Sequence, residues 1–236
     1  MPQRSNSHDI AVNQSASSIP GLVFGARRAI FLDRDGVINQ NRPDHVKSWS
    51  EFVFETNVLP ALARLASLHL PIIVITNQAC IGRGLVGQEV VEDIHRRMVV
   101  AVEKAGGRID HVLYCPHHPS EECACRKPKP GMLLEAAQRW NLDLSRSFLV
   151  GDAITDIQAG WAVGCNTVLV KSGRGAQQWA ALQQGELQQQ GGHPGDIVFN
   201  VAEGLGAAAY WINQQLAYEQ LEHALHQAVP QLAIEA

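Results

Sequence analysis

Short apolar runs alternate with segments of helical periodicity along most of the chain. The runs are rich in β-branched or aromatic residues and are bounded by polar residues or glycine, which is typical of buried strands. They cover residues 29–33, 71–77, 111–115, 147–152 and 167–172, and residues 196–200 are a candidate sixth. Apolar side chains recur at helical spacing in residues 57–68, 88–105, 130–140 and 153–163.

Strands that alternate with helices predict an α/β fold, in which a doubly wound parallel sheet is covered by helices on both faces. The connections are then right-handed crossovers, and ligands bind outside the carboxyl ends of the strands. Polar and charged residues of this chain collect at these ends. We therefore expect the functional site at the carboxyl edge of the sheet.

The chain divides into three parts by composition. Residues 1–25 are polar and rich in Ser and Asn, which predicts a flexible tail. Residues 26–200 contain the alternating pattern and form the predicted catalytic domain. Residues 201–236 predict a C-terminal helical extension of one or two amphipathic helices, packed on the sheet or on a partner.

The composition excludes several classes of protein. With 236 residues, of which 46% are hydrophobic, the chain can bury one proper core. A formal net charge of -4 provides no basic field for nucleic acid. No apolar run approaches the ~20 residues that cross a bilayer, and the N-terminus lacks the apolar stretch of a signal peptide. We therefore expect a cytoplasmic protein that acts on a small molecule, without nucleic-acid or membrane partners.

The first chemical signal is the segment FLDRDGVI, in which Asp33 and Asp35 directly follow the first predicted strand. Carboxylates two positions apart on a loop can converge on one Mg²⁺ ion, which prefers oxygen ligands. The first carboxylate can attack phosphorus, and the second can give a proton to the leaving oxygen and later take one from water. Gly36 allows a sharp turn beside them. The competing interpretation is an Asp-x-Asp turn at the surface.

Three further segments supply groups that phosphoryl transfer needs. Thr76 ends the second strand, and its hydroxyl can bind a phosphoryl oxygen, although a Thr after a strand is often only a helix cap. Lys127, in RKPKPG, can neutralise phosphoryl charge, although such a segment is often a solvated basic loop. In VGDAITD, Asp152 can complete the magnesium site, and Asp156 can hold Lys127 or a metal-bound water, or cap the next helix. Together these groups predict a magnesium-dependent phosphatase that forms an aspartyl-phosphate.

This combination resembles the haloacid dehalogenase (HAD) superfamily, whose four motifs match residues spread over most of the chain. The resemblance implies that Asp33 is the nucleophile and Asp35 the general acid and base. It also implies that Thr76 and Lys127 stabilise the phosphoryl group. Magnesium would be held by Asp33, the backbone carbonyl of Asp35, and Asp152.

A second cluster lies in the segment CPHHPSEECACRKP. It contains three cysteines and one histidine at ligand spacing: Cys115, His117, Cys123 and Cys125. Three thiolates and an imidazole make a closed tetrahedral zinc site, whereas disulfides are not expected in a reducing compartment. His118 is the spare histidine by spacing. We predict a structural zinc that aims the following Arg126 and Lys127 into the site, against the competing interpretation of a chance cluster of free thiols.

The zinc loop is similar to that of the heptose-bisphosphate phosphatases and the related histidinol-phosphate phosphatases. This resemblance implies that there is no large cap domain and that three short loops shape the substrate pocket. The residues implied in substrate binding are Asn41, Arg42, Asp44, Asn77 and Arg126. The chain departs from the family pattern at Ala153, where Lys is common, at Ala79, where Ser is common, and in the loop NRPDHVKSW, which lacks the usual Gly-Tyr. These departures leave the catalytic set intact and concern the substrate.

The expected substrate is a heptose 1,7-bisphosphate that loses its C7 phosphate, with Arg126 gripping the distal phosphate. Histidinol phosphate is the alternative, because an imidazole-bearing substrate would favour a rim carboxylate such as Asp44. A catalytically silent, zinc-stabilised binding module is a further alternative. Binding alone needs no nucleophile such as Asp33, and the intact catalytic set therefore favours an enzyme.

Overall fold

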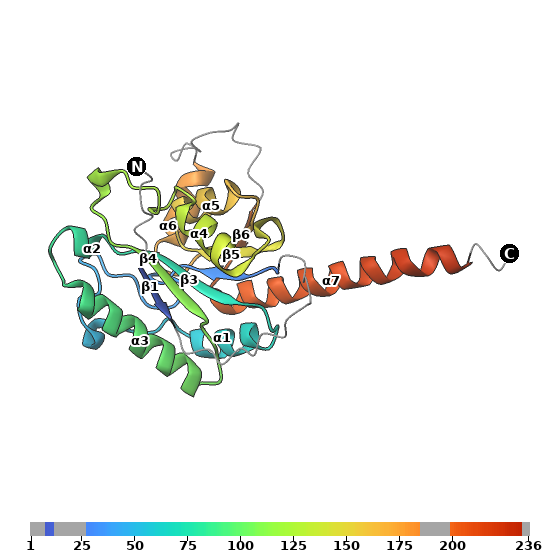
Figure 1. The fold of residues 1–236 in the computed structure, drawn as a ribbon, viewed down its shortest axis with the longest axis horizontal. Helices are drawn as coiled ribbons and strands as arrows, with labels where there is room; N and C mark the ends of the chain where they lie inside the picture. Colours follow the sequence, from blue (N-terminus) through green and yellow to red (C-terminus); the bar gives the residue numbers. More distant parts are fainter. Residues whose placement is uncertain (1–7, 12–26, 185–198, 233–236) are drawn as a thin grey trace.

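The computed structural model describes residues 8–11, 27–184 and 199–232 (Figure 1). Its centre is a seven-stranded sheet in the order β1-β4-β3-β2-β5-β6-β7. All neighbouring strands are parallel except β1, which pairs antiparallel with β4 at one edge. The strands are β1 (His8–Ala11), β2 (Ile30–Leu32), β3 (Ile72–Asn77), β4 (His111–Cys115), β5 (Phe148–Gly151), β6 (Asn166–Val170) and β7 (Asn200–Ala202).

Helices cover both faces of the sheet (Figure 1). One face carries α1 (Val58–Ala66), α3 (Gln88–Lys104) and α7 (Leu205–Leu232), and the other carries α4 (Gly131–Trp140), α5 (Ile154–Trp161) and α6 (Gly175–Gln183). Short turns lie in the loops: α2 (Ala79–Gly82), η1 (Trp49–Glu51), η2 (Pro119–Glu121) and η3 (Leu144–Arg146). Alternate strand residues point to opposite faces, so Leu32 packs under the first group of helices and Phe31 under the second. Burial on both faces explains why the strands read as continuous apolar runs.

The predicted fold class is confirmed. The first five predicted strands and the four predicted helices end within two residues of β2 to β6 and of α1, α3, α4 and α5. No inserted cap domain interrupts the residues that the structure describes.

The two ends of the chain differ from the sequence pattern. Within the predicted tail, residues 8–11 form β1, which the pattern did not indicate because four residues carry little periodicity and the edge of β4 supplies the pairing. The rest of that tail lies outside the described residues, as does most of the predicted strand 196–200, and β7 begins at Asn200. The helix α6 was not predicted. Within the predicted C-terminal extension, residues 201 and 202 complete β7, and the described residues that follow contain one helix, α7. The division into three parts stays a prediction.

The helix α7 packs by its first turns and then projects from the body (Figure 1). Ala208 and Ile212 are fully buried, whereas Tyr218, Leu221 and Leu225 are more than half exposed. Packing at its base therefore supplies the tertiary support that a helix needs in water. Neither α7 nor any other helix among the described residues is both long and apolar enough to cross a membrane.

The strand order reverses at β2, and this reversal positions the site. From β2 the chain builds outward through β3 and β4, and it then returns to the other side of β2 with β5, β6 and β7. In open α/β sheets a crevice forms at such a point, outside the carboxyl ends of the strands. Asp33 follows β2 and Asp152 follows β5. The topology therefore brings these two carboxylates to the same crevice.

Candidate active site

Asp33 and Asp152 lie at the ends of neighbouring strands. The Asp33 amide donates a hydrogen bond to the Val150 carbonyl at 2.9 Å, and the two aspartates are 5% and 0% exposed. Oδ2 of Asp152 accepts from the Arg174 amide at 2.8 Å and from Asn41 Nδ2 at 3.2 Å. Oδ1 of Asp152 is buried without a hydrogen-bond partner among the described residues. A buried carboxylate oxygen in this state is suited to binding a cation.

Two glycines enclose the Asp152 carboxylate. Gly36 has a φ of 90° and Gly173 a φ of 56°, both in the left-handed region that favours glycine. A Cβ atom added at Gly36 would lie 2.1 Å from Oδ2 of Asp152, and one added at Gly173 would lie 2.4 Å from it. Backbone conformation and space thus both exclude larger residues, and the carboxylate is held from two sides.

Lys127 is the buried cation that joins the acidic groups. Its ammonium group lies 2.8 Å from Asp33 Oδ1 and 2.7 Å from Asp156 Oδ1, and it donates to the Ile75 carbonyl at 2.8 Å. These partners match the three donors of an ammonium group. Burial disfavours the charged form, but the attraction of Asp156 and Asp33 together is larger and raises the pKa of Lys127 above its usual value. Lys127 therefore remains protonated and places a positive charge beside Asp33.

Asp156 and Asn77 hold Lys127 from two different elements. Asp156 lies in the first turn of α5, where its Oδ2 accepts from the Ala153 amide at 3.1 Å. It therefore caps the helix with one oxygen and holds the lysine with the other. At the end of β3, Asn77 Oδ1 accepts from the Lys127 amide at 3.1 Å, and Asn77 Nδ2 donates to the Lys127 carbonyl at 3.1 Å.

The buried ionisable groups carry unequal charge. Oxygens of Asp33, Asp152 and Asp156 lie within 4.8 Å of one another, against the ammonium group of Lys127 and the guanidinium group of Arg174, whose Nε atom is 3.6 Å from Asp152 Oδ2. Burial, despite the opposing effect of Lys127, raises the pKa of Asp33 to about 6, and burial and the charge of Asp33 raise the pKa of Asp152. A divalent cation would relieve this repulsion. Because both oxygens of Asp156 are already bonded, Asp33 and Asp152 are the carboxylates that fit such a cation.

The Asp35 carboxylate lies in a separate polar network. It accepts hydrogen bonds of 2.9 Å from Arg34 Nη2, from Asn39 Nδ2 and from Gln78 Nε2. Although burial acts in the opposite direction, the charge of Arg34 and these bonds lower the pKa of Asp35. Gln78 Nε2 also donates to Thr76 Oγ1 at 2.9 Å. Asp35 and Thr76 are thus held by one shared donor.

The residues expected to bind substrate differ in their surroundings. Arg126 lines a cavity of about 390 Å³ beside Lys127, and its Nη1 atom is buried without a hydrogen-bond partner among the described residues. Arg42 forms an ion pair with Asp44 at 3.2 Å on the exposed rim. Asn41 and Asn77 are engaged with protein atoms, as described above. A substrate contact of these residues stays a prediction.

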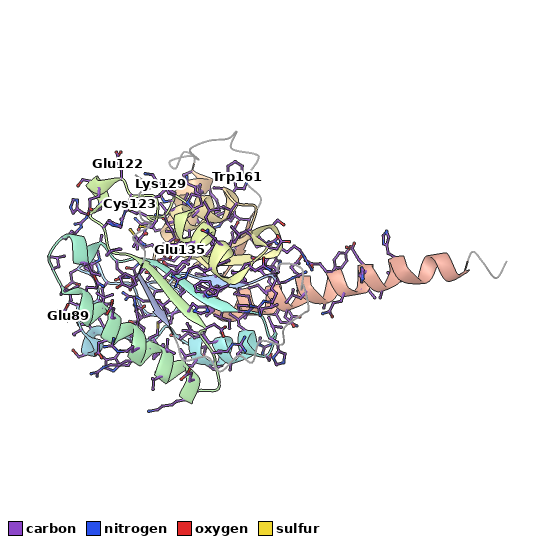
Figure 2. All side chains as sticks on the ribbon, in the orientation of Figure 1. Glu89, Glu122, Cys123, Lys129, Glu135 and Trp161 are labelled. Atoms are coloured by element: carbon purple, nitrogen blue, oxygen red, sulfur yellow. The ribbon has the colours of Figure 1, made fainter. Side chains whose placement is uncertain are left out.

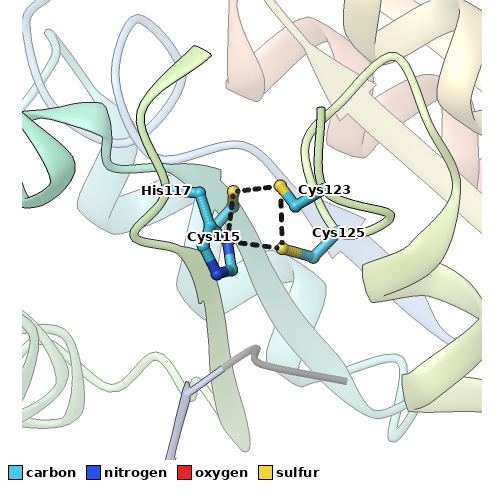
Figure 3. Close-up of side chains that lie close together, drawn as sticks. All are labelled: Cys115, His117, Cys123 and Cys125. Atoms are coloured by element: carbon cyan, nitrogen blue, oxygen red, sulfur yellow. Dashed lines mark hydrogen bonds between the residues drawn. The ribbon is translucent and has the colours of Figure 1, made fainter. Parts of the chain in front are cut away.

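Four predicted zinc ligands converge at the end of β4: Cys115, His117, Cys123 and Cys125 (Figure 3). Sγ of Cys123 lies 3.4 Å from Sγ of Cys115 and 3.4 Å from Sγ of Cys125. His117 Nδ1 lies 3.5 Å from Sγ of Cys115 and 3.2 Å from Sγ of Cys125. A tetrahedral ion with Zn–S bonds of about 2.3 Å separates its sulfur ligands by about 3.7 Å, so the cluster has the size of a zinc site. His118 is outside the cluster and contacts Ser120.

The zinc loop has an exposed tip and a buried base. Glu122 and Lys129 mark its outer part in Figure 2, with Cys123 close by. Cys125 and Lys127 at its base are 6% and 4% exposed. A metal in the cluster would therefore fix the chain two residues before Lys127.

Sequence reasoning missed several residues around the site: Arg34, Gln78, His95 and Gly173. Arg34 separates the two aspartates, and Gln78 follows Thr76 by two positions, so proximity to the motifs was an available signal. His95 lies within α3 and showed only helical spacing. Nothing along the chain indicates that His95 contacts Arg34.

Comparisons with known proteins agree with this arrangement. Residues 124–203 match the HAD-hydrolase-like family model. The D-glycero-beta-D-manno-heptose-1,7-bisphosphate 7-phosphatase of Pseudomonas aeruginosa is 42% identical over 150 residues, which are 64% of this chain and 84% of that protein. The enzyme of the same name from Bordetella bronchiseptica is 40% identical over 162 residues, which are 69% of this chain and 89% of that protein.

A solved structure extends the likeness to three dimensions. The crystal structure of D,D-heptose 1,7-bisphosphate phosphatase from B. bronchiseptica, complexed with magnesium and phosphate, matches with a TM-score of 0.71. The two chains are 38% identical, and the match covers 80% of this chain and 99% of that one.

The glycine that touches Asp152 provides a first test. We expect Gly173→Ala to weaken Mg²⁺ binding by roughly 10-fold or more, because the new methyl group displaces the carboxylate. Gly84→Ala is the matched control, since Gly84 has a φ of 66° but nothing lies within 4 Å of an added Cβ atom. Both variants should lose about 1–2 kcal/mol of unfolding free energy from backbone strain. Gly173→Ala should lose more, because its Cβ atom would also lie 2.5 Å from Gly36 Cα. Calorimetric Mg²⁺ titration and urea unfolding separate the two effects, and equal Mg²⁺ affinities would contradict the prediction.

The cysteine cluster provides a second test. We expect the purified protein to contain about one zinc ion per chain, and Cys123→Ser to lose most of it, because structural zinc needs four ligands. Cys165→Ala should keep the zinc, since Cys165 lies outside the cluster. Metal analysis measures the content, and kcat/KM of the chelated protein should fall roughly 10- to 100-fold as Lys127 loses its position. Full activity without zinc would refute the positioning role.

Proposed function

Because the chain belongs to the heptose-bisphosphate phosphatase family of the HAD superfamily, we propose that it removes the 7-phosphate from D-glycero-D-manno-heptose-1,7-bisphosphate. The observation that carries the proposal is the buried contact of Lys127 with Asp33, next to the unbonded oxygen of Asp152. The names of the relatives specify the β anomer, and the proposal adopts it. The reaction would take place in the cytoplasm, on a small phosphorylated sugar and without nucleic-acid or membrane partners.

In the first half of the reaction, an oxygen of Asp33 attacks phosphorus while the bond from phosphorus to the C7 oxygen breaks. Lys127 balances the negative charge of the phosphoryl oxygens, and the Thr76 hydroxyl donates a hydrogen bond to one of them. Asp35 enters this half in its protonated form, which Arg34 disfavours, and gives the proton to the departing oxygen, which leaves as a sugar hydroxyl. The products are heptose 1-phosphate and a phosphorylated Asp33.

In the second half, water attacks the phosphorus atom and the bond to the Asp33 oxygen breaks. Asp35, which is now ionised, takes the proton from that water. The Arg34 guanidinium group suits Asp35 to this step, because it favours the ionised carboxylate. Inorganic phosphate is released, and the Asp33 carboxylate is restored.

Magnesium is the cofactor of the proposal, as it is present in the related Bordetella structure. The buried, unbonded Oδ1 of Asp152 and the excess of carboxylates around Lys127 fit a divalent cation. Asp33 and Asp152 would hold it, with the predicted help of the Asp35 backbone carbonyl. When bound, magnesium supplies further positive charge to the phosphoryl group.

The surroundings of two rim residues favour a bisphosphate substrate. Arg126 has a buried guanidinium nitrogen without a hydrogen-bond partner in the described part of the chain, as a site for a second phosphate requires. Asp44, which an imidazole-bearing substrate would use, already pairs with Arg42 and Lys47. We therefore prefer heptose bisphosphate to histidinol phosphate.

The covalent mechanism predicts the effect of removing the nucleophile. Asp33→Asn should lower kcat by at least about 10³-fold, because the amide oxygen is a poor nucleophile. Asp143→Asn, at a partly exposed aspartate that precedes β5 and so lies at the opposite end of this strand from Asp152, should retain activity. The assay compares turnover of p-nitrophenyl phosphate and of the heptose bisphosphate with and without Mg²⁺. Turnover that survives Asp33→Asn would rule out the aspartyl-phosphate.

The substrate assignment predicts a selective effect at Arg126. Arg126→Met should raise KM for the heptose 1,7-bisphosphate roughly 10- to 100-fold and change KM for heptose 7-phosphate little, because only the former has a distal phosphate. Arg96→Met, on the exposed face of α3, is the control. The assay should include both anomers and histidinol phosphate. Faster turnover of histidinol phosphate than of either bisphosphate anomer would refute the assignment.

A further inference from the structure

We propose that Arg34, His95 and Gln78 form a positioning unit that fixes the Asp35 carboxylate for proton transfer. The inference rests on the proposed role of Asp35 as general acid and base. It goes beyond that role because it assigns a task to three buried side chains that do not themselves contact the phosphoryl group in the proposed mechanism. We call these three residues the Asp35 cradle.

Arg34 is the centre of the cradle. It lies between the two aspartates in a loop, yet it is only 1% exposed. Its Nη2 atom lies 2.9 Å from Oδ1 and 2.9 Å from Oδ2 of Asp35, and 3.1 Å from Oε1 of Gln78. Burying a guanidinium group costs several kcal/mol unless it is paired and hydrogen-bonded. Asp35, Gln78 and His95 supply that pairing at the two Nη atoms, whereas Nε has no hydrogen-bond partner among the described residues.

His95 anchors the far side of the guanidinium group. Its Nε2 atom lies 2.9 Å from Arg34 Nη1. Arginine only donates hydrogen bonds, so Nε2 must accept, which assigns the ring proton to Nδ1 and makes His95 neutral. His95 is fully buried on α3 and packs edge to face against Tyr114, with the two ring centroids 5.4 Å apart. The orientation of Arg34 is therefore set by a helix that is distant in sequence from the catalytic loop.

Gln78 completes the cradle and connects it to the phosphate-binding side. Its Oε1 atom accepts from Arg34, which leaves Nε2 to donate to Asp35 Oδ2 at 2.9 Å and to Thr76 Oγ1 at 2.9 Å. Asn39 Nδ2 donates to the other oxygen, Oδ1, of Asp35. Each oxygen of Asp35 thus has an amide donor in addition to Arg34. This set of contacts determines both the position and the rotation of the carboxylate.

Fixing the carboxylate matters because proton transfer requires hydrogen-bond contact with the leaving oxygen, and small displacements cost rate. The benefit depends on the leaving group. A sugar oxygen needs a proton to depart, whereas p-nitrophenolate is stable as an anion and needs little help. Loss of the cradle should therefore slow phosphoryl transfer to Asp33 from a sugar phosphate more than from p-nitrophenyl phosphate. Loss of stability or of the metal site would slow both alike.

The test compares kcat/KM on p-nitrophenyl phosphate and on the sugar phosphate that the enzyme hydrolyses best. This constant reports the half reaction in which the leaving oxygen departs, and it excludes the attack of water on phosphorylated Asp33, which both substrates share. Asp35→Asn shows how much more the sugar phosphate loses than p-nitrophenyl phosphate when the carboxylate itself is removed, and the other variants are compared with this ratio. Arg34→Met and His95→Phe should lower kcat/KM roughly 10- to 100-fold on the sugar phosphate and at most about 3-fold on p-nitrophenyl phosphate. His95→Gln should recover most of the loss, because its amide oxygen can accept from Arg34. If Arg34→Met fails to fold, Gln78→Leu replaces it, and we expect the same difference between the two substrates.

The control is Val102→Ala, which removes a fully buried side chain from the same helix without touching the cradle. It should lower the unfolding free energy and leave the ratio of the two rates unchanged. Equal losses on both substrates in the cradle variants, or no losses, would overturn the inference if Asp35→Asn itself discriminates between the substrates. Equal losses in Asp35→Asn would instead overturn the proposed acid role of Asp35, and the inference with it.

Discussion

A lysine that is cut off from water must be surrounded by negative charge, and the architecture of this site depends on that requirement. Lys127 reaches Asp33 at the end of β2, the Ile75 carbonyl in β3 and Asp156 in α5. Removing one partner of such a buried pair typically costs about 3–5 kcal/mol, because the other charge remains buried and unpaired. The ammonium group is thus stable only when these elements assemble together. The contacts that form the site therefore form only when these strands and this helix pack together.

Two aspartates only two positions apart have opposite surroundings. Asp33 lies among other carboxylates, and burial raises its pKa to about 6 in spite of Lys127. Asp35 lies among donors, and the pKa of Asp35 is lowered because Arg34 and two amides outweigh burial. The turn at Gly36, beside Asp152, accompanies this separation. A divalent cation held by Asp33 and Asp152 would lower the pKa of Asp33 toward the ionised form that attack on phosphorus needs. The donors around Asp35 favour the ionised form that takes a proton from water.

The fold could be predicted from the sequence because it follows from local rules, and the roles of the site residues stay predictions. Continuous apolar runs identified β2 to β6, and strand topology then implied that Asp33 and Asp152 meet, as they do. The grouping of the four predicted zinc ligands could be predicted from the sequence because they lie within eleven residues. The Asp35 cradle could not be predicted from the sequence, because the contact between Arg34 and His95 depends on how α3 packs against the sheet. In the same way, the hydrogen bond from Asn41 to Asp152 and the pairing of β1 with β4 depend on tertiary contacts that no local pattern records.

The amide of Asn77 binds both the N–H and the carbonyl of Lys127, as a neighbouring strand would. The chain between the end of β4 and Lys127 is consequently a loop. Its second end, at Lys127, is fixed by Asn77 whatever the length of the loop. Lengthening a surface loop costs little conformational entropy, since doubling it adds only about 0.6 kcal/mol. The outer part of this loop, around Glu122, can therefore change in evolution while Lys127 keeps its contact with Asp33, the proposed nucleophile. A catalytic apparatus of this kind can acquire new substrates by remodelling its periphery.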